Sequence, residues 1–290
     1  MSEKKEAKLK KHETFSIRDG WLEKAINLLE DNPNLFAKDN GQQILGIGTN
    51  MVKSLRYWTD ACGLIKFKQG TGYSYRELGG FLKKNDPYLN DKNSWWLIHM
   101  FLVSNDDEAP VFNCFFNMNL NKFDKEQLFT QIKSKLEEEY TLGADSSLEV
   151  DCNMLIKTYF SDDISNPEDN MTCPFSKLGL LSTNDKKIYT KSQPKYMDID
   201  YKIIFYCMLK SIERKEEDEK KKGNVYKLDS FNLEDLFSWK NNPLRIFNIS
   251  KSSMFQYLDE MKKNGLISLI KTAGLNTITI NERKTLKDLF

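Results

Sequence analysis

Residues 45–78 have the sequence LGIGTNMVKSLRYWTDACGLIKFKQGTGYSYREL, and this stretch decides the fold of the first part of the chain. Four apolar residues recur at helical spacing and would face a core: Met51, Leu55, Trp58 and Cys62. Gly63 ends the predicted helix as a C′ glycine, because glycine adopts the left-handed conformation without strain. Residues 64–67 and 73–75 then form the strands of a hairpin around the turn 69–72. This order predicts a winged helix-turn-helix.

The same segment carries a local positive charge. Lysine and arginine outnumber acidic residues by seven to two between positions 53 and 84. The residues expected on the outer face of the helix are Asn50, Lys53, Ser54, Arg56 and Tyr57. Winged helices bind DNA with one helix in the major groove and the wing against phosphates, through basic and amide side chains. The candidate DNA contacts are therefore Asn50, Lys53, Arg56, Lys66, Lys68 and Arg76. The alternative is a protein-binding module whose Arg56 and Tyr57 are covered by the rest of the chain.

Composition limits the class of protein. The chain has 290 residues and a formal net charge of +1, so affinity for nucleic acid has to come from local patches. Five dispersed cysteines and two histidines argue against a zinc site and favour reduced thiols. The charged N-terminus is unlike a signal peptide, and the longest apolar run is far shorter than the roughly 20 residues of a membrane span. We expect a soluble, cytoplasmic protein.

The sequence predicts a mainly α fold with small β-hairpins, of the α+β class, divided into four parts. Residues 1–13 are rich in lysine and predict a mobile basic tail, and a solvated end is favoured over the alternative of a DNA-tethering arm. Residues 14–105 would form the N-terminal winged-helix domain and residues 106–195 a helical middle region. In the latter, Asp124 is the expected N-cap of a helix from Lys125 to Tyr140. Residues 196–290 would form a C-terminal winged-helix-like domain.

The C-terminal prediction rests on an internal similarity. Residues 249–267 align with residues 47–65 without a gap, and both segments end in Gly-Leu-Ile. A second hairpin follows, with Gly274 at its predicted turn. Duplication of the structural type is favoured over convergence on a common helix-to-wing solution. The second helix carries Asp259 and Glu260, so it is the weaker candidate for DNA contact.

Signals for catalysis are sparse. The chain has no GxxxxGK phosphate loop, and no nucleophilic dyad is evident from spacing. Asp86, Asp91 and His99 are the candidate catalytic residues. The two carboxylates could bind a divalent metal, magnesium or manganese, beside the imidazole. A structural role is favoured over this chemistry, with Asp86 and Asp91 capping helices and His99 hydrogen-bonded in the core.

Five stretches together resemble the domain of unknown function 4007 family: residues 15–24, 45–58, 86–89, 96–99 and 115–117. Members of that family are encoded beside cysteine desulfurase and PAPS-reductase-like proteins. One characterised group is the B component of the Ssp system, which installs phosphorothioate linkages on one DNA strand. The resemblance implies a double-stranded-DNA-binding subunit that nicks one strand in a bacterial anti-phage defence system. The expected partners also include an ATPase component and a second copy of the chain. The alternative is a non-enzymatic DNA-binding adaptor or transcriptional regulator.

Overall fold

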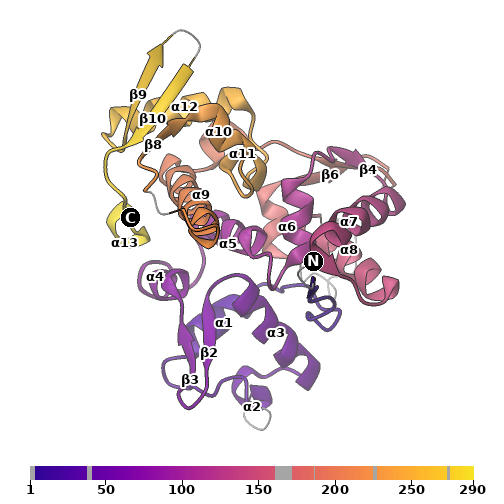
Figure 1. The fold of residues 1–290 in the computed structure, drawn as a ribbon. Coiled ribbons are helices and arrows are strands. Elements are labelled where there is room, and N and C mark those ends of the chain that lie inside the picture. The colour runs from indigo at the N-terminus through magenta and orange to yellow at the C-terminus, as the bar shows by residue number, and fades with distance from the viewer. Residues whose placement is uncertain (1–3, 38–40, 161–171, 186, 225–226, 273–274) are drawn as a thin grey trace. The chain divides into compact units, whose positions relative to one another are not determined.

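The chain forms two compact units, Met1–Ser192 and Gln193–Phe290 (Figure 1). This computed structural model describes residues 4–37, 41–160, 172–185, 187–224, 227–272 and 275–290. The fold is mainly helical with four small sheets in the described residues, so the predicted α+β class is confirmed. The predicted N-terminal domain and almost all of the predicted middle region lie within the first unit. Within the described ranges, no helix is both long and apolar enough to cross a membrane.

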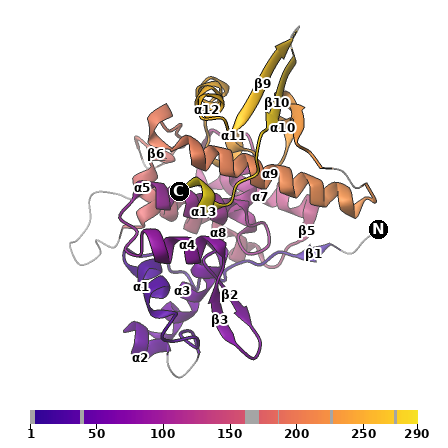
Figure 2. The same ribbon diagram turned by 90° about the vertical axis from the view of Figure 1, so that its left-hand side faces the viewer.

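The first unit begins its helical part with three helices, a hairpin and a fourth helix. In chain order these are α1 (Trp21–Leu28), α2 (Gly41–Leu45), α3 (Thr49–Ala61), β2 (Ile65–Lys68), β3 (Gly72–Tyr75) and α4 (Glu77–Asn85). Both α1 and α2 pack on α3, and the hairpin follows α3 directly (Figures 1 and 2). The antiparallel strands pair Ile65 with Tyr75 and Lys68 with Gly72. The helix and hairpin therefore lie where the sequence predicts them.

The remainder of the first unit packs further helices against this group. They are α5 (Lys92–Ser104), α6 (Pro110–Asn117), α7 (Lys125–Glu139), α8 (Asp145–Tyr159) and the 3-10 helix η1 (Pro174–Leu178). A capping box at Asp124 begins α7, which confirms the predicted cap. Trp58 of α3 contacts Phe112 of α6 edge to face, with ring centroids 5.8 Å apart. One core therefore joins the predicted N-terminal domain to the middle region.

Two small sheets also belong to the first unit. In one, β1 (Lys5–Glu6) pairs in parallel with β5 (Tyr140–Thr141). The other has the order β4-β7-β6, from Lys122–Phe123, Tyr189–Lys191 and Leu181–Thr183. The first of these sheets ties the N-terminal segment to the end of α7, although the two segments are far apart in sequence.

The second unit combines helices with a three-stranded sheet. Its elements are η2 (Tyr196–Asp198), α9 (Tyr201–Lys221), β8 (Ser230–Asn232), α10 (Leu233–Ser238), α11 (Pro243–Ile246), α12 (Lys251–Lys263), β9 (Ile267–Thr272), β10 (Leu275–Ile280) and α13 (Leu286–Leu289). The sheet has the order β8-β10-β9, and α12 packs on both α9 and β9. The predicted helix and hairpin of this unit are thus present as elements. Gly274, the predicted turn residue, lies outside the described residues.

Candidate nucleic-acid interface

Helix α3 presents one polar face to solvent. Asn50, Lys53 and Arg56 are exposed, as the sequence predicts. Their spacing of three residues places them along one side of the helix, because such positions lie one above the other. The Asn50 side-chain oxygen accepts a hydrogen bond from Lys53 Nζ at 3.4 Å. The exposed face thus offers an amide, an ammonium and a guanidinium group to a ligand.

Of the residues expected on this face, Ser54 lies inside instead and Tyr57 is half-buried. Ser54 is fully buried, and its hydroxyl donates to the Phe15 carbonyl at 3.2 Å. The Tyr57 hydroxyl donates to the Glu108 carbonyl at 3.0 Å, and burial raises the pKa of this phenol well above its ordinary value. Both acceptors belong to segments that pack against α3 from outside the helix–hairpin segment. The apolar stripe also differs by one residue, since Val52 is buried where Met51 was expected.

The hairpin extends the basic surface. Lys66, Phe67 and Lys68 of β2 are exposed. Arg76, also a candidate DNA contact, already has partners in the protein. Its Nη2 lies 2.7 Å from Asp60 Oδ1 of α3, and its Nε donates to the Ile65 carbonyl at 2.8 Å. The guanidinium therefore holds the start of α4 against α3 and β2, and its role in DNA binding stays a prediction.

Residues 4–14, the described N-terminal segment, are docked on the rest of the first unit, which corrects the prediction of a mobile tail for residues 4–13. His12 is 1% exposed, and its Nε2 lies 2.6 Å from Asp151 Oδ1 of α8. The Thr14 backbone N–H donates to His12 Nδ1 at 3.2 Å, so Nε2 is the nitrogen that carries the proton toward the carboxylate. The Lys10 N–H donates to both Asp151 oxygens at 3.0 Å. The imidazole also stacks on Trp58 of α3, with ring centroids 5.9 Å apart.

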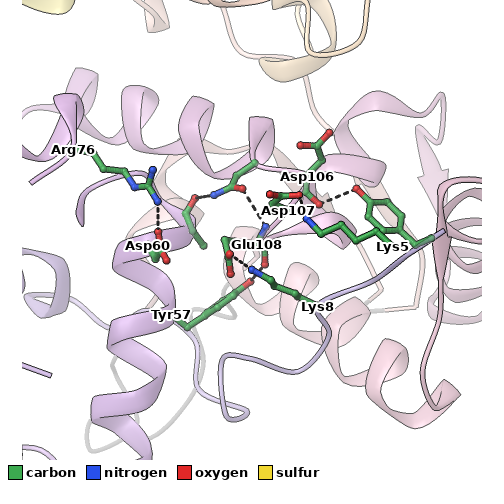
Figure 3. A network of polar contacts seen from close by, with 11 residues as sticks. Lys5, Lys8, Tyr57, Asp60, Arg76, Asp106, Asp107 and Glu108 are labelled. Carbon is green, nitrogen blue, oxygen red and sulfur yellow. Dashed lines mark hydrogen bonds and ion pairs between the residues drawn. The ribbon is translucent and has the colours of Figure 1, made fainter. Parts of the chain in front are cut away.

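This docking places lysines beside α3. Ion pairs join Lys5 to Asp107 and Lys8 to Glu108 in the turn between α5 and α6 (Figure 3). The same view shows Tyr57 reaching toward Glu108. The lysine-rich segment is therefore fixed at both ends, by the α5–α6 turn and by Asp151.

The docked segment, α3 and the hairpin enclose a groove of about 670 Å³. The groove is lined by Lys8, Leu9, Lys10, Lys11, Glu13, Lys53, Arg56, Tyr57, Asp60, Ile65, Lys66, Phe67, Tyr73 and Glu108. Two of its three acidic residues form ion pairs, Asp60 with Arg76 and Glu108 with Lys8 (Figure 3), and the third is Glu13. Within the described part of the chain, five lining cations have no ion-pair partner: Lys10, Lys11, Lys53, Arg56 and Lys66. The groove therefore carries an excess of positive charge, which suits the phosphates of a nucleic acid.

Sequence reasoning found three of these five cations and missed Lys10 and Lys11. Both were assigned to the expected free tail. The signal available in the sequence was a histidine within the lysine run, at position 12. A single histidine in the sequence does not indicate which residue it will bind, and Asp151 lies 139 residues away.

The candidate catalytic residues occupy structural positions. Asp86 accepts hydrogen bonds from the backbone N–H groups of Asn90 and Asp91, both at 3.0 Å, and from the Ser94 hydroxyl at 2.6 Å. Asp91 is the N-cap of α5 and accepts from the Asn93 N–H at 2.8 Å. The two aspartates lie together in the α4–α5 turn, where their carboxylates organise the backbone.

His99 lies deeper, in the core of the first unit. It is fully buried, and its Nδ1 lies 2.7 Å from the Tyr159 hydroxyl. Among the described residues, no group of three or more His, Cys, Asp or Glu side chains is arranged to hold a metal ion. The set of Asp86, Asp91 and His99 does not fit a divalent-metal site, and a catalytic role for these residues stays a prediction.

The comparisons with known proteins agree on the fold. Residues 9–289 match the model of the family described as protein of unknown function (DUF4007). The chain belongs to the DUF4007 family. A crystal structure of SspB superposes with a TM-score of 0.82 at 24% sequence identity, covering 96% of this chain and 85% of that one. A structure of magnesium-bound SspB gives a TM-score of 0.80 at the same identity, covering 96% and 84%. No curated protein sequence matches the chain. At this identity the likeness to SspB establishes a shared fold.

Proposed function

We propose that this DUF4007 protein is the DNA-binding component of a bacterial phosphorothioate modification system that defends against phage. The observation that carries the proposal is the groove of the first unit, whose five cations have no ion-pair partner within the described residues. Membership of DUF4007 and the fold shared with SspB support the assignment to that kind of system. The proposed partners are double-stranded DNA, cysteine desulfurase, PAPS-reductase-like and ATPase components, and a second copy of the chain.

The proposed binding mode is that of a winged helix. Asn50 and Arg56 on α3 carry the side-chain types that form bidentate hydrogen bonds with adenine and guanine in the major groove. Lys66 and Lys68 of the hairpin, with Lys10 and Lys11 of the docked segment, would contact phosphates on either side of α3. The first group would select sequence, and the second would supply affinity that depends strongly on salt.

The finer proposal is that the protein nicks one DNA strand so that sulfur can be inserted. It derives from the family resemblance, while Asp86, Asp91 and His99 are engaged in structural hydrogen bonds. The direct test incubates the purified protein with supercoiled plasmid and magnesium or manganese. Conversion to open-circle DNA is the expected result. Intact supercoiled plasmid, under conditions where a mobility shift shows binding, would exclude nicking by this protein alone.

The alternative is a non-enzymatic adaptor or regulator, which is favoured by the structural roles of those three residues. Asp91→Asn separates the two functions, because asparagine caps a helix about as well as aspartate but lacks the carboxylate. The adaptor hypothesis predicts unchanged DNA modification in cells that carry this variant, and loss of modification with Lys53→Glu/Arg56→Glu. Loss of modification by a stably folded Asp91→Asn protein would instead support a catalytic role for the carboxylate.

A further inference from the structure

An exposed aromatic ring lies within the cationic groove. Phe67 is 62% exposed, although burial of a phenylalanine side chain normally stabilises a fold. It lies between Lys66 and Lys68 in β2 and lines the groove together with Lys66 and Tyr73. The ring is therefore displayed at the place where positive charge gathers.

The Phe67 ring is also held in position by neighbouring aromatic rings. Phe67 pairs with Tyr73 across the hairpin, and their ring centroids are 5.1 Å apart. Tyr73 in turn contacts buried Phe36 edge to face, again with centroids 5.1 Å apart. The Tyr73 backbone N–H donates to the Pro33 carbonyl at 2.8 Å, which fixes the strand. A series of three rings thus leads from the core to the groove and limits the entropy lost when a ligand binds Phe67.

The combination of an exposed aromatic ring and neighbouring cations suits a specific kind of ligand. An aromatic ring beside cations is the arrangement on which unpaired nucleobases stack while lysine and arginine follow the phosphates. In an intact duplex each base is stacked on its neighbours and presents only its edges to the protein. We propose that the groove holds a locally unpaired DNA strand and that one of its bases stacks on Phe67. This inference rests on the proposed function, since it specifies the form of DNA that the same groove receives.

The second hairpin provides a contrast. Among the described residues of that hairpin, Ile270 is an exposed apolar residue, 56% exposed, and it has no aromatic face to offer a base. Within the first unit, Tyr88 is 63% exposed but belongs to the α4–α5 turn and does not line the groove. Tyr88 is therefore a matched control for Phe67.

The test is a binding titration with the full-length protein and two DNA probes of the same sequence. Each probe carries one 2-aminopurine, whose fluorescence falls when it stacks on an aromatic ring. In one probe the base is fully paired, and in the other it lies in a short unpaired gap. The proteins are the wild type, Phe67→Leu, Phe67→Trp and Tyr88→Leu. Circular dichroism and a thermal melt establish that each variant is folded.

We expect the wild type to bind the gapped probe more tightly and to quench its fluorescence. Phe67→Leu should weaken binding to the gapped probe by about fivefold to a hundredfold, the range for loss of one stacked base, with little effect on the paired probe. Phe67→Trp should retain quenching, and Tyr88→Leu should behave as the wild type. Equal weakening on both probes, or no effect of Phe67→Leu on either, would overturn the inference. Wild-type binding to the paired probe would still support the proposed function, and binding to neither probe would contradict both.

Discussion

The two helix–hairpin segments of this protein share a sequence pattern but differ in what surrounds them. Helices α3 and α12 each have 13 residues, and each is followed by Gly-Leu-Ile and an antiparallel hairpin. Gly63 and Gly265 occupy the same position and have nearly the same backbone angle, with φ of +69° and +71°. The shared pattern therefore specifies the same local turn in both units.

The two helices differ in whether the charged residues on their exposed faces have ion-pair partners. On α3, the exposed Lys53 and Arg56 have no ion-pair partner among the described residues. On α12, Lys251 pairs with Glu234 at 2.7 Å, and exposed Asp259 adds a negative charge. The docked N-terminal segment brings further lysines to the first segment. A shared helix–hairpin pattern therefore does not imply a shared ligand.

The hairpins are supported differently as well. Strand β10 pairs with β8 over three residues, which completes a three-stranded sheet. Strand β3 instead forms a hydrogen bond to a loop, in which the Tyr73 N–H donates to the Pro33 carbonyl. The first hairpin therefore lacks the third strand that supports the second hairpin. Its residues Lys66, Phe67 and Tyr73 line the groove.

The largest expected effect is on DNA affinity. Lys53→Glu/Arg56→Glu should weaken binding of a duplex by roughly a thousandfold, because two cations on the face of α3 that meets the DNA become anions, which the negatively charged DNA repels. The matched variant Lys262→Glu/Lys263→Glu, which places the same charge change on α12, should alter affinity by less than about threefold. Fluorescence anisotropy at several salt concentrations measures both. Equal losses in the two variants would contradict the distinction between the segments.

The next effect concerns the docked N-terminal segment. His12→Ala removes the proton donor of a carboxylate whose side chain is 8% exposed, and should lower the free energy of unfolding by about 2–3 kcal/mol. It should also weaken DNA binding, because Lys10 and Lys11 lose their fixed position. Lys251→Ala, which breaks the exposed pair with Glu234, should cost less than about 1 kcal/mol.

Urea denaturation followed by circular dichroism compares the two variants. Hydrogen–deuterium exchange by mass spectrometry then identifies which unit has been destabilised. Unchanged stability in His12→Ala would mean that the N-terminal segment is not held by the buried pair.

A smaller effect distinguishes the two glycines. Gly265→Ala should cost about 1–2 kcal/mol, since alanine is strained at positive φ while open space surrounds the position. Gly63→Ala should cost about 1–3 kcal/mol more, because the new Cβ would lie 2.6 Å from Cδ1 of Phe101. Thermal unfolding of the two variants gives the difference. Equal costs would show that Phe101 moves aside freely.

The smallest expected effect is a pH dependence of stability. The Arg283 guanidinium holds the pKa of Glu216 below its ordinary value. A carboxylate with a lowered folded-state pKa stabilises the protein above its unfolded pKa of about 4.3, and this stabilisation is lost as pH falls through the folded value. The second unit should therefore weaken in acid, and Glu216→Gln should reduce that dependence.

Tyr57, a half-buried residue of the first unit, predicts a dependence at the alkaline end of the pH range. Burial raises its pKa, so its stabilisation is complete below about pH 10 and is lost as pH rises further. Thermal unfolding at pH 3, 7 and 11 of the wild type, Glu216→Gln and Tyr57→Phe checks both directions. The same loss of stability in acid for Glu216→Gln as for the wild type, or the same loss in alkali for Tyr57→Phe as for the wild type, would contradict the respective prediction.

The sequence predicted what depends on local spacing. The apolar period of α3, the glycine that ends it and the cap at Asp124 each follow from a few neighbouring residues. The exposure of Lys53 and Arg56 also follows from that period. These features need no knowledge of distant segments.

What the sequence did not predict depends on pairing over long distances. Ser54 is buried because the Phe15 carbonyl meets it, 39 residues away. The N-terminal segment is docked because His12 meets Asp151 on α8. No local sequence pattern identifies the Phe15 carbonyl or Asp151 as a partner. The lysine-rich segment was therefore predicted to be a free tail. The groove itself was missed for the same reason, since one of its walls is that segment.

The central claim is that DNA lies along α3, the first hairpin and the docked N-terminal segment. Ultraviolet cross-linking of the full-length protein to duplexes substituted with 5-iodouracil, followed by peptide mass spectrometry, tests it most directly. Cross-links are expected in peptides that span residues 8–13 and 50–76. Cross-links confined to residues 249–280, with the first unit unlabelled, would contradict the claim.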